Sequence, residues 1–126
     1  MLAAEPDALH GALIRAALEQ LGHGMLHGQD GQRALELLKL GDVDVVLISG
    51  AMIGLSGPDT IKAVRALETP AARAPIVAVI GGEIEEAQAC LKAGADAVLR
   101  KPVTVGSLAR ALAAALDPNN RAAEAA

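Results

Sequence analysis

The sequence has no aromatic residues: none of its 126 residues is Phe, Tyr or Trp. Stacking on nucleobases or on flat cofactors therefore has no aromatic side chains to use. Hydrophobic residues nevertheless make up 52% of the chain, a fraction too high for a disordered protein. The sequence predicts a folded domain whose core is built from Leu, Ile, Val and Ala.

Cysteine, long apolar runs and positive charge are also scarce. The single cysteine, Cys90, cannot form an internal disulfide, which is typical of a reducing compartment. Its apolar helical spacing predicts a buried, inert thiol. No apolar run approaches the roughly 20 residues of a membrane-spanning helix, and the first residues do not resemble a signal peptide. From the cysteine usage and the lack of apolar runs we expect a cytoplasmic protein that does not bind membranes. The net charge of −4 argues against nucleic-acid binding.

Strand patterns and helical patterns alternate along the chain. The expected strands are the short apolar segments at residues 1–4, 24–27, 44–48, 76–80 and 97–99. Apolar residues recur with helical spacing over residues 7–21, 31–40 (ended by Gly41), 58–67, 83–93 and 105–116 (capped by Thr104). This alternation predicts a single doubly wound α/β domain of the flavodoxin-like kind, with a parallel sheet in the order 2-1-3-4-5.

The length of the chain corresponds to one domain. We assign residues 1–117 to that domain and residues 118–126, which lack an apolar stripe, to a flexible C-terminal tail or linker. In a doubly wound sheet, ligands bind outside the carboxyl ends of the strands, near the switch point between the first and third strands. The residues that this rule selects are Glu5, Pro6, Ser49, Ile80 and Lys101.

Four stretches share the order and spacing of one known family. They are residues 18–23, 31–38, 44–57 and 90–96, the last followed by Lys101-Pro102. Together they resemble the response-regulator receiver (CheY-like) domains over about residues 1–116. The resemblance implies phosphoryl transfer from a histidine kinase to an aspartate at the end of the third strand. It also implies two acidic residues that help to hold Mg²⁺, and a lysine and a hydroxyl that bind the phosphoryl oxygens.

The matching positions carry few of these groups. Ser49 stands at the acceptor position, Pro6 replaces the second acidic residue after Glu5, and Ile80 occupies the hydroxyl position. Only Lys101 matches the family in full. Because Mg²⁺ dehydrates reluctantly and would gain little from one carboxylate, we predict that Mg²⁺ binding and phosphorylation by acyl-phosphate donors are lost. No cofactor, metal or catalytic residue is expected.

Simpler roles remain open for several polar residues. Glu5 and Lys101 are expected to form a structural ion pair or to stay as two solvated groups. Ser49 has no histidine beside it in the family geometry, so it is expected to close a strand rather than to act as a nucleophile. His23 and His27 lie about 13 Å apart along a predicted strand, which is too far to share a metal.

The leading hypothesis is a pseudo-receiver module of bacterial two-component signalling. Such a module would dock to a histidine kinase, to a phosphotransfer protein or to a neighbouring domain of a hybrid kinase, without accepting phosphate. The surface that the family presents to kinases corresponds to His10 (expected to be exposed), Leu13, Ile14, Pro102 and Thr104. The surface that the family uses for output and dimerisation corresponds to Ile84, Gln88, Val98 and Arg110.

Two alternatives come from other classes of protein. Some degenerate receivers bind a cyclic dinucleotide, but here the missing aromatics and scattered arginines give that function little support. A residual phosphoacceptor would have to use another carboxylate, for example Asp44 or Asp59. An enzymatic function has no convergent catalytic residues behind it.

Overall fold

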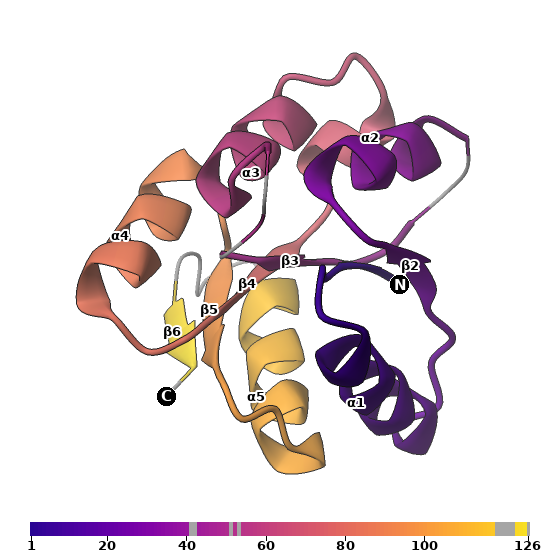
Figure 1. Ribbon diagram of the computed structural model, residues 1–126, viewed down its shortest axis with the longest axis vertical. Helices are drawn as coiled ribbons and strands as arrows, with labels where there is room; N and C mark the ends of the chain where they lie inside the picture. Colours follow the sequence, from indigo (N-terminus) through magenta and orange to yellow (C-terminus); the bar gives the residue numbers. More distant parts are fainter. Residues whose placement is uncertain (41–42, 51, 53, 118–122, 126) are drawn as a thin grey trace.

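The computed structural model describes residues 1–40, 43–50, 52, 54–117 and 123–125 (Figure 1). The strands form one sheet in the order β2-β1-β3-β4-β5-β6, and all neighbouring strands are parallel. The strands are β1 (Leu2–Ala4), β2 (Leu26–Gly28), β3 (Val46–Ser49), β4 (Ile76–Ile80), β5 (Ala97–Arg100) and β6 (Ala123–Ala125). The predicted α/β fold and strand order 2-1-3-4-5 are confirmed, and β6 extends the sheet beyond β5.

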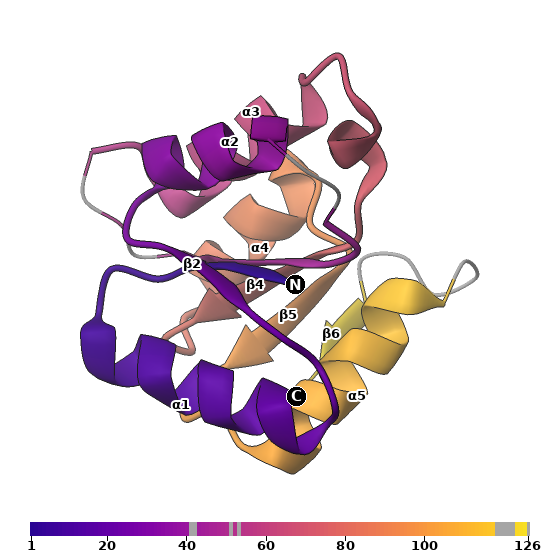
Figure 2. The same cartoon turned by 90° about the vertical axis from the view of Figure 1, so that its right-hand side faces the viewer.

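Helices cover both faces of the sheet. Helices α1 and α5 lie on one face, and α2, α3 and α4 lie on the other (Figures 1 and 2). The α-helices are α1 (Ala8–Gln20), α2 (Gly31–Leu40), α3 (Gly57–Arg65), α4 (Ile84–Ala93) and α5 (Val105–Leu116). A short 3₁₀ helix, η1 (Pro70–Arg73), precedes β4. Within the described residues, no helix is long and apolar enough to cross a bilayer.

The two faces of the sheet carry separate aliphatic cores. Ile48 and Ile76 pack in the core beneath α2, α3 and α4, whereas Leu47 and Val77 pack with α1 and α5. All residues of β3 and β4 are buried. The sequence predicted this burial, because both strands are apolar at successive positions, which is typical of parallel strands covered on both faces.

Short polar side chains begin two of the helices, among them the predicted cap Thr104, and a proline lies in the first turn of a third. Asp30 accepts a hydrogen bond from the backbone N–H of Arg33 at 2.7 Å. Thr104 and Ser107 form a reciprocal capping box at the start of α5. Pro58 lies in the first turn of α3, where its missing N–H leaves no hydrogen bond unmade.

Two strands have boundaries that differ from the predicted ones, because pairing with a neighbouring strand and not hydropathy determines where they begin and end. The second strand covers Leu26–Gly28 rather than residues 24–27, because Leu26 is the residue that pairs with Leu2 at the start of β1. The third strand extends to Ser49, which pairs with Val79. Local hydropathy does not contain this pairing information.

The C-terminal residues differ most from the prediction. Residues 123–125 pair with β5 as β6, although they were expected to belong to a flexible tail. Residues 118–122 and 126 lie outside the described residues, and so does the predicted end of the second helix at Gly41. The division into a domain of residues 1–117 and a tail stays a prediction.

Candidate functional site

The candidate site lies where four strands of the sheet end. Glu5 directly follows β1 and Lys101 directly follows β5, while Ser49 and Ile80 are the last residues of β3 and β4. Because neighbouring parallel strands end at the same edge, the fold brings these four residues to one place. Pro6 follows Glu5 there and is exposed.

A buried ion pair joins β1 to β5. The Nζ atom of Lys101 lies 3.0 Å from Oε1 of Glu5, whose side chain is 2% exposed against 22% for Lys101. The other carboxylate oxygen, Oε2, accepts a hydrogen bond from the backbone N–H of Asp7 at 3.1 Å. Both oxygens of Glu5 are thus occupied by groups of the chain itself, and the ion-pair alternative of the sequence analysis is the one that the structure contains.

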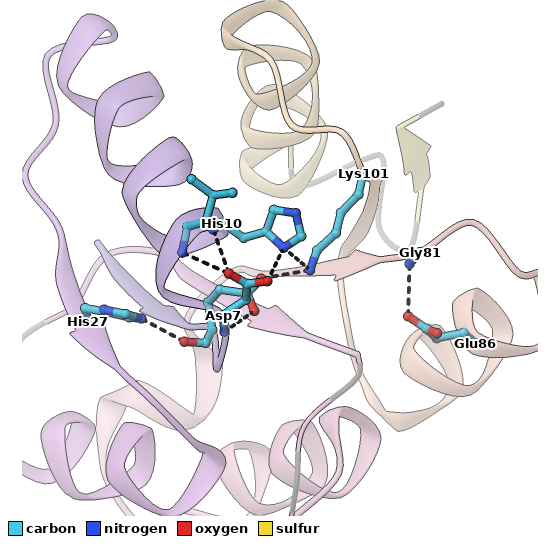
Figure 3. Close-up of polar contacts among 8 residues, drawn as sticks. Asp7, His10, His27, Gly81, Glu86 and Lys101 are labelled. Atoms are coloured by element: carbon cyan, nitrogen blue, oxygen red, sulfur yellow. Dashed lines mark hydrogen bonds and ion pairs between the residues drawn. The ribbon is translucent and has the colours of Figure 1, made fainter.

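His10 extends this pair onto α1. Its Nδ1 atom lies 3.1 Å from Nζ of Lys101 and 3.5 Å from Oδ2 of Asp7 (Figure 3). Because an ammonium group can only donate, Nδ1 is the acceptor wherever Lys101 and His10 form this hydrogen bond. The His10 side chain is 38% exposed, so the sequence predicted its exposure only in part and missed its contact with Lys101.

Asp7 and His27 fix the backbone around Glu5. The carboxylate of Asp7 caps α1 by accepting hydrogen bonds from the backbone N–H groups of Leu9 and His10. Those hydrogen bonds, first that from His10, lower the pKa of Asp7 below its usual value. On the other side, Nε2 of His27 lies 2.8 Å from the carbonyl oxygen of Glu5. His27 therefore makes a structural contact with the backbone of Glu5.

Two further positions of the family pattern, Ser49 and Ile80, are closed to solvent, because both residues are buried in the sheet. Ser49 offers a neutral hydroxyl at the end of β3, and Ile80 offers only methyl groups at the end of β4. Mg²⁺ prefers several hard oxygen ligands in octahedral geometry. Within the described part of the chain, no group of three or more His, Cys, Asp or Glu side chains is arranged to hold a metal ion.

A further carboxylate reaches this edge from α4. Oε1 of Glu86 accepts a hydrogen bond from the backbone N–H of Gly81 at 3.2 Å, and Gly81 directly follows β4. The sequence predicted no contact for Glu86. The signal that could have found it is the pair of glycines, Gly50 and Gly81, that follow the two central strands.

The two predicted docking surfaces require correction at one residue each. Ile14 is buried in the core beneath α1, because it lies one position beyond Leu13 and therefore faces about 100° further around the helix. Leu13 itself is 47% exposed, and Leu9, one turn earlier, is 68% exposed. Pro102 and Thr104 are exposed.

On the second surface, Val98 is fully buried. It lies in β5 between β4 and β6 and points into the core beneath α4. Ile84, Gln88 and Arg110 are exposed as predicted. This surface therefore consists of side chains from the two helices and not from the strand between them.

Two hollows of the molecule lie away from the candidate site. One, of about 460 Å³, is lined by Leu38 and Pro75 among others, and the other, of about 720 Å³, is lined by Arg65 and Leu116 among others. Pro75 lies just before β4, at the opposite end of the strand from Ile80. Neither hollow is lined by Glu5, Ser49 or Lys101.

Comparison with known proteins shows which family has this arrangement of strands and helices. Residues 1–113 match the family model of the response regulator receiver domain. The chain is 30% identical over 115 residues to the sensory/regulatory protein RpfC of Xanthomonas campestris, covering 90% of this chain and 16% of that protein. It is 31% identical over 108 residues to the aerobic respiration control sensor protein ArcB of Escherichia coli, covering 86% of this chain and 14% of that protein. The chain thus spans about one-sixth or less of the length of these relatives.

Solved structures agree with this match. The receiver domain of the sensor histidine kinase PA1611 from Pseudomonas aeruginosa, solved with a magnesium ion coordinated in its active site cleft, is 27% identical with a TM-score of 0.80. The match covers 86% of this chain and 89% of that one. Chemotaxis protein CheY4 of Vibrio cholerae shares the fold, with a TM-score of 0.83 at 24% identity, over 91% of this chain and 96% of that one. The chain belongs to the family of response regulator receiver domains.

Proposed function

We propose that this chain is a receiver module of two-component signalling that accepts no phosphoryl group. It acts in the cytoplasm by docking to a histidine kinase, to a phosphotransfer protein or to an adjacent domain, and it performs no catalysis. The observation that carries this proposal is the set of contacts made by the Glu5 carboxylate. Its two carboxylate oxygens are engaged by Lys101 and by the backbone of Asp7, so the one acid of the family pattern that is present here is occupied.

The donors at the strand ends do not fit Mg²⁺. An incoming ion would have to displace Lys101 from Glu5 and would find no carboxylate at the other two acidic positions of the family pattern, where Pro6 and Ser49 stand. Mg²⁺ releases its water ligands reluctantly and gains most from charged oxygens. The proposed mechanism therefore includes no step in which a metal takes part.

The phosphoryl group lacks both its nucleophile and its binding partner. A serine hydroxyl is a weak nucleophile unless a base lies beside it, and Ser49 is buried at the end of β3. Ile80 places methyl groups where a phosphoryl oxygen would need a hydrogen-bond donor. Lys101 alone supplies positive charge, and that charge is already paired with Glu5.

The docking surface that we favour is the exposed side of α1. Leu9 and Leu13 are separated by one helical turn and therefore lie on the same side of the helix. His10 borders them and connects them to Lys101. Two exposed leucines beside a polar cluster are suited to an apolar helix face of a partner, the kind of surface that a helical phosphotransfer domain offers.

The curated relatives suggest where such a module would work. RpfC and ArcB are described as sensor or sensory/regulatory proteins, and the matched region is a small part of each. We therefore place this chain in the signalling path of a sensor protein, either within such a protein or beside it. Its output would be the presence or absence of docking rather than a phosphorylation state.

The contacts of Arg65 and the position of Asp44 weaken the two alternative functions, which are cyclic-dinucleotide binding and phosphorylation of another carboxylate. The Arg65 guanidinium is engaged by the backbone oxygens of Ala72, Ala74 and Gly94 and by the carboxylate of Asp96, which leaves it little capacity for a cyclic dinucleotide. Asp44 lies before β3, at the end opposite to Ser49.

Exposure to acetyl phosphate and Mg²⁺, followed by intact-mass spectrometry, tests the loss of phosphoryl transfer. We expect no gain of a phosphoryl group; the receiver domain of PA1611, whose structure holds a magnesium ion, is treated in parallel for comparison. A covalent phosphoryl group on any residue of this chain would overturn the proposal. Asp59 in particular would be identified by peptide mapping.

Titration calorimetry with phosphotransfer domains and histidine kinases of the same cell tests the docking. Leu13→Glu should weaken binding at least tenfold, because a charge would replace an apolar contact. Leu40→Glu is the matched control, since Leu40 is 80% exposed and lies on α2, on the other face of the sheet. Equal binding by both variants and the unmodified chain would exclude α1 as the docking surface.

A further inference from the structure

The Glu86 carboxylate lies across the ends of the two central strands. Its Oε1 accepts a hydrogen bond from the Gly81 N–H (Figure 3). A Cβ atom added to Gly50 would collide with the same carboxylate. Gly50 directly follows Ser49, and Gly81 directly follows Ile80. The acid therefore sits beside the two positions at which the family places the phosphoacceptor and the phosphoryl-binding hydroxyl.

The backbone does not require glycine at either of these positions. Four glycines of the described chain have positive φ angles, and neither Gly50 nor Gly81 is among them. At Gly81 an added Cβ would meet no atom within 4 Å. At Gly50 the three nearest atoms to an added Cβ all belong to Glu86. The missing side chain of Gly50 thus provides the space that the Glu86 carboxylate occupies.

A simpler role for Glu86 is to place negative charge at the positive end of the helix dipole. Glu85 in the same turn supplies that charge from an exposed position, so the dipole does not require Glu86 to fold back. Glu83, at the N-cap, makes no side-chain capping bond. Glu86 differs from both because it reaches past the helix start to the ends of β3 and β4.

We infer that the Glu86 carboxylate is a permanent internal substitute for the phosphoryl group, holding α4 in one position against the ends of β3 and β4. This inference rests on the proposed function, since an acid in this place is compatible only with a pocket that takes no phosphate. Two negative groups this close would repel each other. The same contact anchors α4, whose exposed residues Ile84 and Gln88 belong to the second docking surface.

The consequence concerns regulation of that surface. In a phosphorylated receiver an anion arrives from outside and leaves again. Here the anion is a side chain of α4 itself, so the position of α4 does not depend on a kinase. The α4 surface is presented to a partner at all times, and control has to act through the partner or through the amount of this protein.

The amide proton of Gly81 reports directly on this contact. In ¹H–¹⁵N NMR spectra of the full chain, its chemical shift and its exchange rate with water should both depend on the Glu86 side chain. Glu86→Gln should shift the Gly81 amide resonance, because a neutral acceptor replaces a charged one, and Glu86→Ala should raise the exchange rate of the Gly81 amide with water about tenfold. Glu85→Gln is the matched control and should leave both the chemical shift and the exchange rate unchanged.

A steric variant tests the same contact without removing the acid. Gly50→Ala should displace the Glu86 carboxylate and raise the exchange rate of the Gly81 amide as Glu86→Ala does, although Glu86 is still present. It should also broaden the resonances of α4 as the helix loses its single position. A Gly81 amide whose exchange rate is unchanged in Glu86→Ala, or in Gly50→Ala, would overturn the inference. Failure of the proposed function would instead appear as phosphorylation of the unmodified chain, which the acetyl phosphate experiment detects separately.

Discussion

Lys101 forms an ion pair with Glu5, an acid whose side chain is buried. The Oε1 atom of Glu5 is fully buried and has no hydrogen bond in the described structure, so the Lys101 ammonium 3.0 Å away is what compensates its charge. A buried charge without a partner is far more costly than a buried pair is favourable. The pair therefore makes the folded state sensitive to the loss of either member.

Lys101→Met should destabilise the protein strongly. The substitution leaves the Glu5 carboxylate buried and uncompensated, and we expect the free energy of unfolding to fall by roughly 3 kcal/mol. Urea denaturation followed by far-UV circular dichroism measures the change. The double variant Glu5→Gln/Lys101→Met should recover most of that loss, because neither charge remains. A double variant as unstable as Lys101→Met alone would show that packing of the lysine chain, and not charge, is the cause.

Asp7 should make a pH-dependent contribution to stability. Hydrogen bonds from the backbone N–H groups of His10 and Leu9 lower its pKa in the folded state. The unfolded chain therefore binds the proton more tightly, and the contribution of Asp7 is complete above pH 3.8, its usual pKa, and is lost as the pH falls through the lowered value.

The variant Asp7→Asn keeps an oxygen that can cap α1 but cannot titrate. The difference in unfolding free energy between the unmodified chain and Asp7→Asn should be constant near neutral pH and should shrink below pH 3.8. Thermal unfolding at a series of pH values measures it. A difference that does not change with pH would mean that the Asp7 carboxylate gains nothing from these hydrogen bonds in the folded state.

The fold could be predicted from the sequence because its strands are short, apolar and separated by well-capped helices. Residues 76–80 were placed as a strand at the same boundaries that the structure has. The β2 strand was placed two residues early at its start, because its position depends on pairing with Leu2. The β6 strand was missed because residues 123–125 have no strand pattern of their own and form a strand only by pairing with β5.

The candidate site could be predicted only in part. The positions of Glu5 and Lys101 follow from the strand order, since each residue comes directly after a strand. The contact of His10 with Lys101 joins residues 91 positions apart and depends on the angle at which α1 leaves β1. The reach of Glu86 to Gly81 depends on a side-chain conformation. The first feature has no signal in local sequence patterns, and the second has only the indirect one of the glycines that follow β3 and β4.

Cys90 should be unreactive in the folded protein at ordinary pH. Burial, and next the negative charge of Glu86, raise the pKa of its thiol to about 11. The thiolate is the reactive form, so alkylation by iodoacetamide at pH 8 should follow unfolding and not the native state. Alkylation at the same rate with and without urea would contradict the buried placement of Cys90.

The same pKa predicts a loss of stability in alkaline solution. Above the usual value of 9.0 the unfolded thiol loses its proton while the folded one keeps it. The free energy of unfolding should therefore fall by about 1.4 kcal/mol per pH unit between pH 9 and pH 11. Other groups also titrate in this range, so the measurement compares the unmodified chain with Cys90→Ala. Equal slopes in the two proteins would assign the loss to those other groups.

Leu13 and Ile14 are neighbours in sequence, but Leu13 is exposed and Ile14 is buried. Substitutions at these two positions therefore distinguish an effect on folding from an effect on docking. Ile14 is buried among the core residues beneath α1, so Ile14→Glu would place a charge in an aliphatic core and should largely unfold the domain. Leu13 is 47% exposed, so Leu13→Glu should change the free energy of unfolding by about 0.5 kcal/mol or less. Circular dichroism with urea distinguishes the two outcomes. A folded and stable Ile14→Glu variant would mean that α1 is rotated about its axis relative to this structure, and the docking surface would then have to be assigned to a different side of the helix.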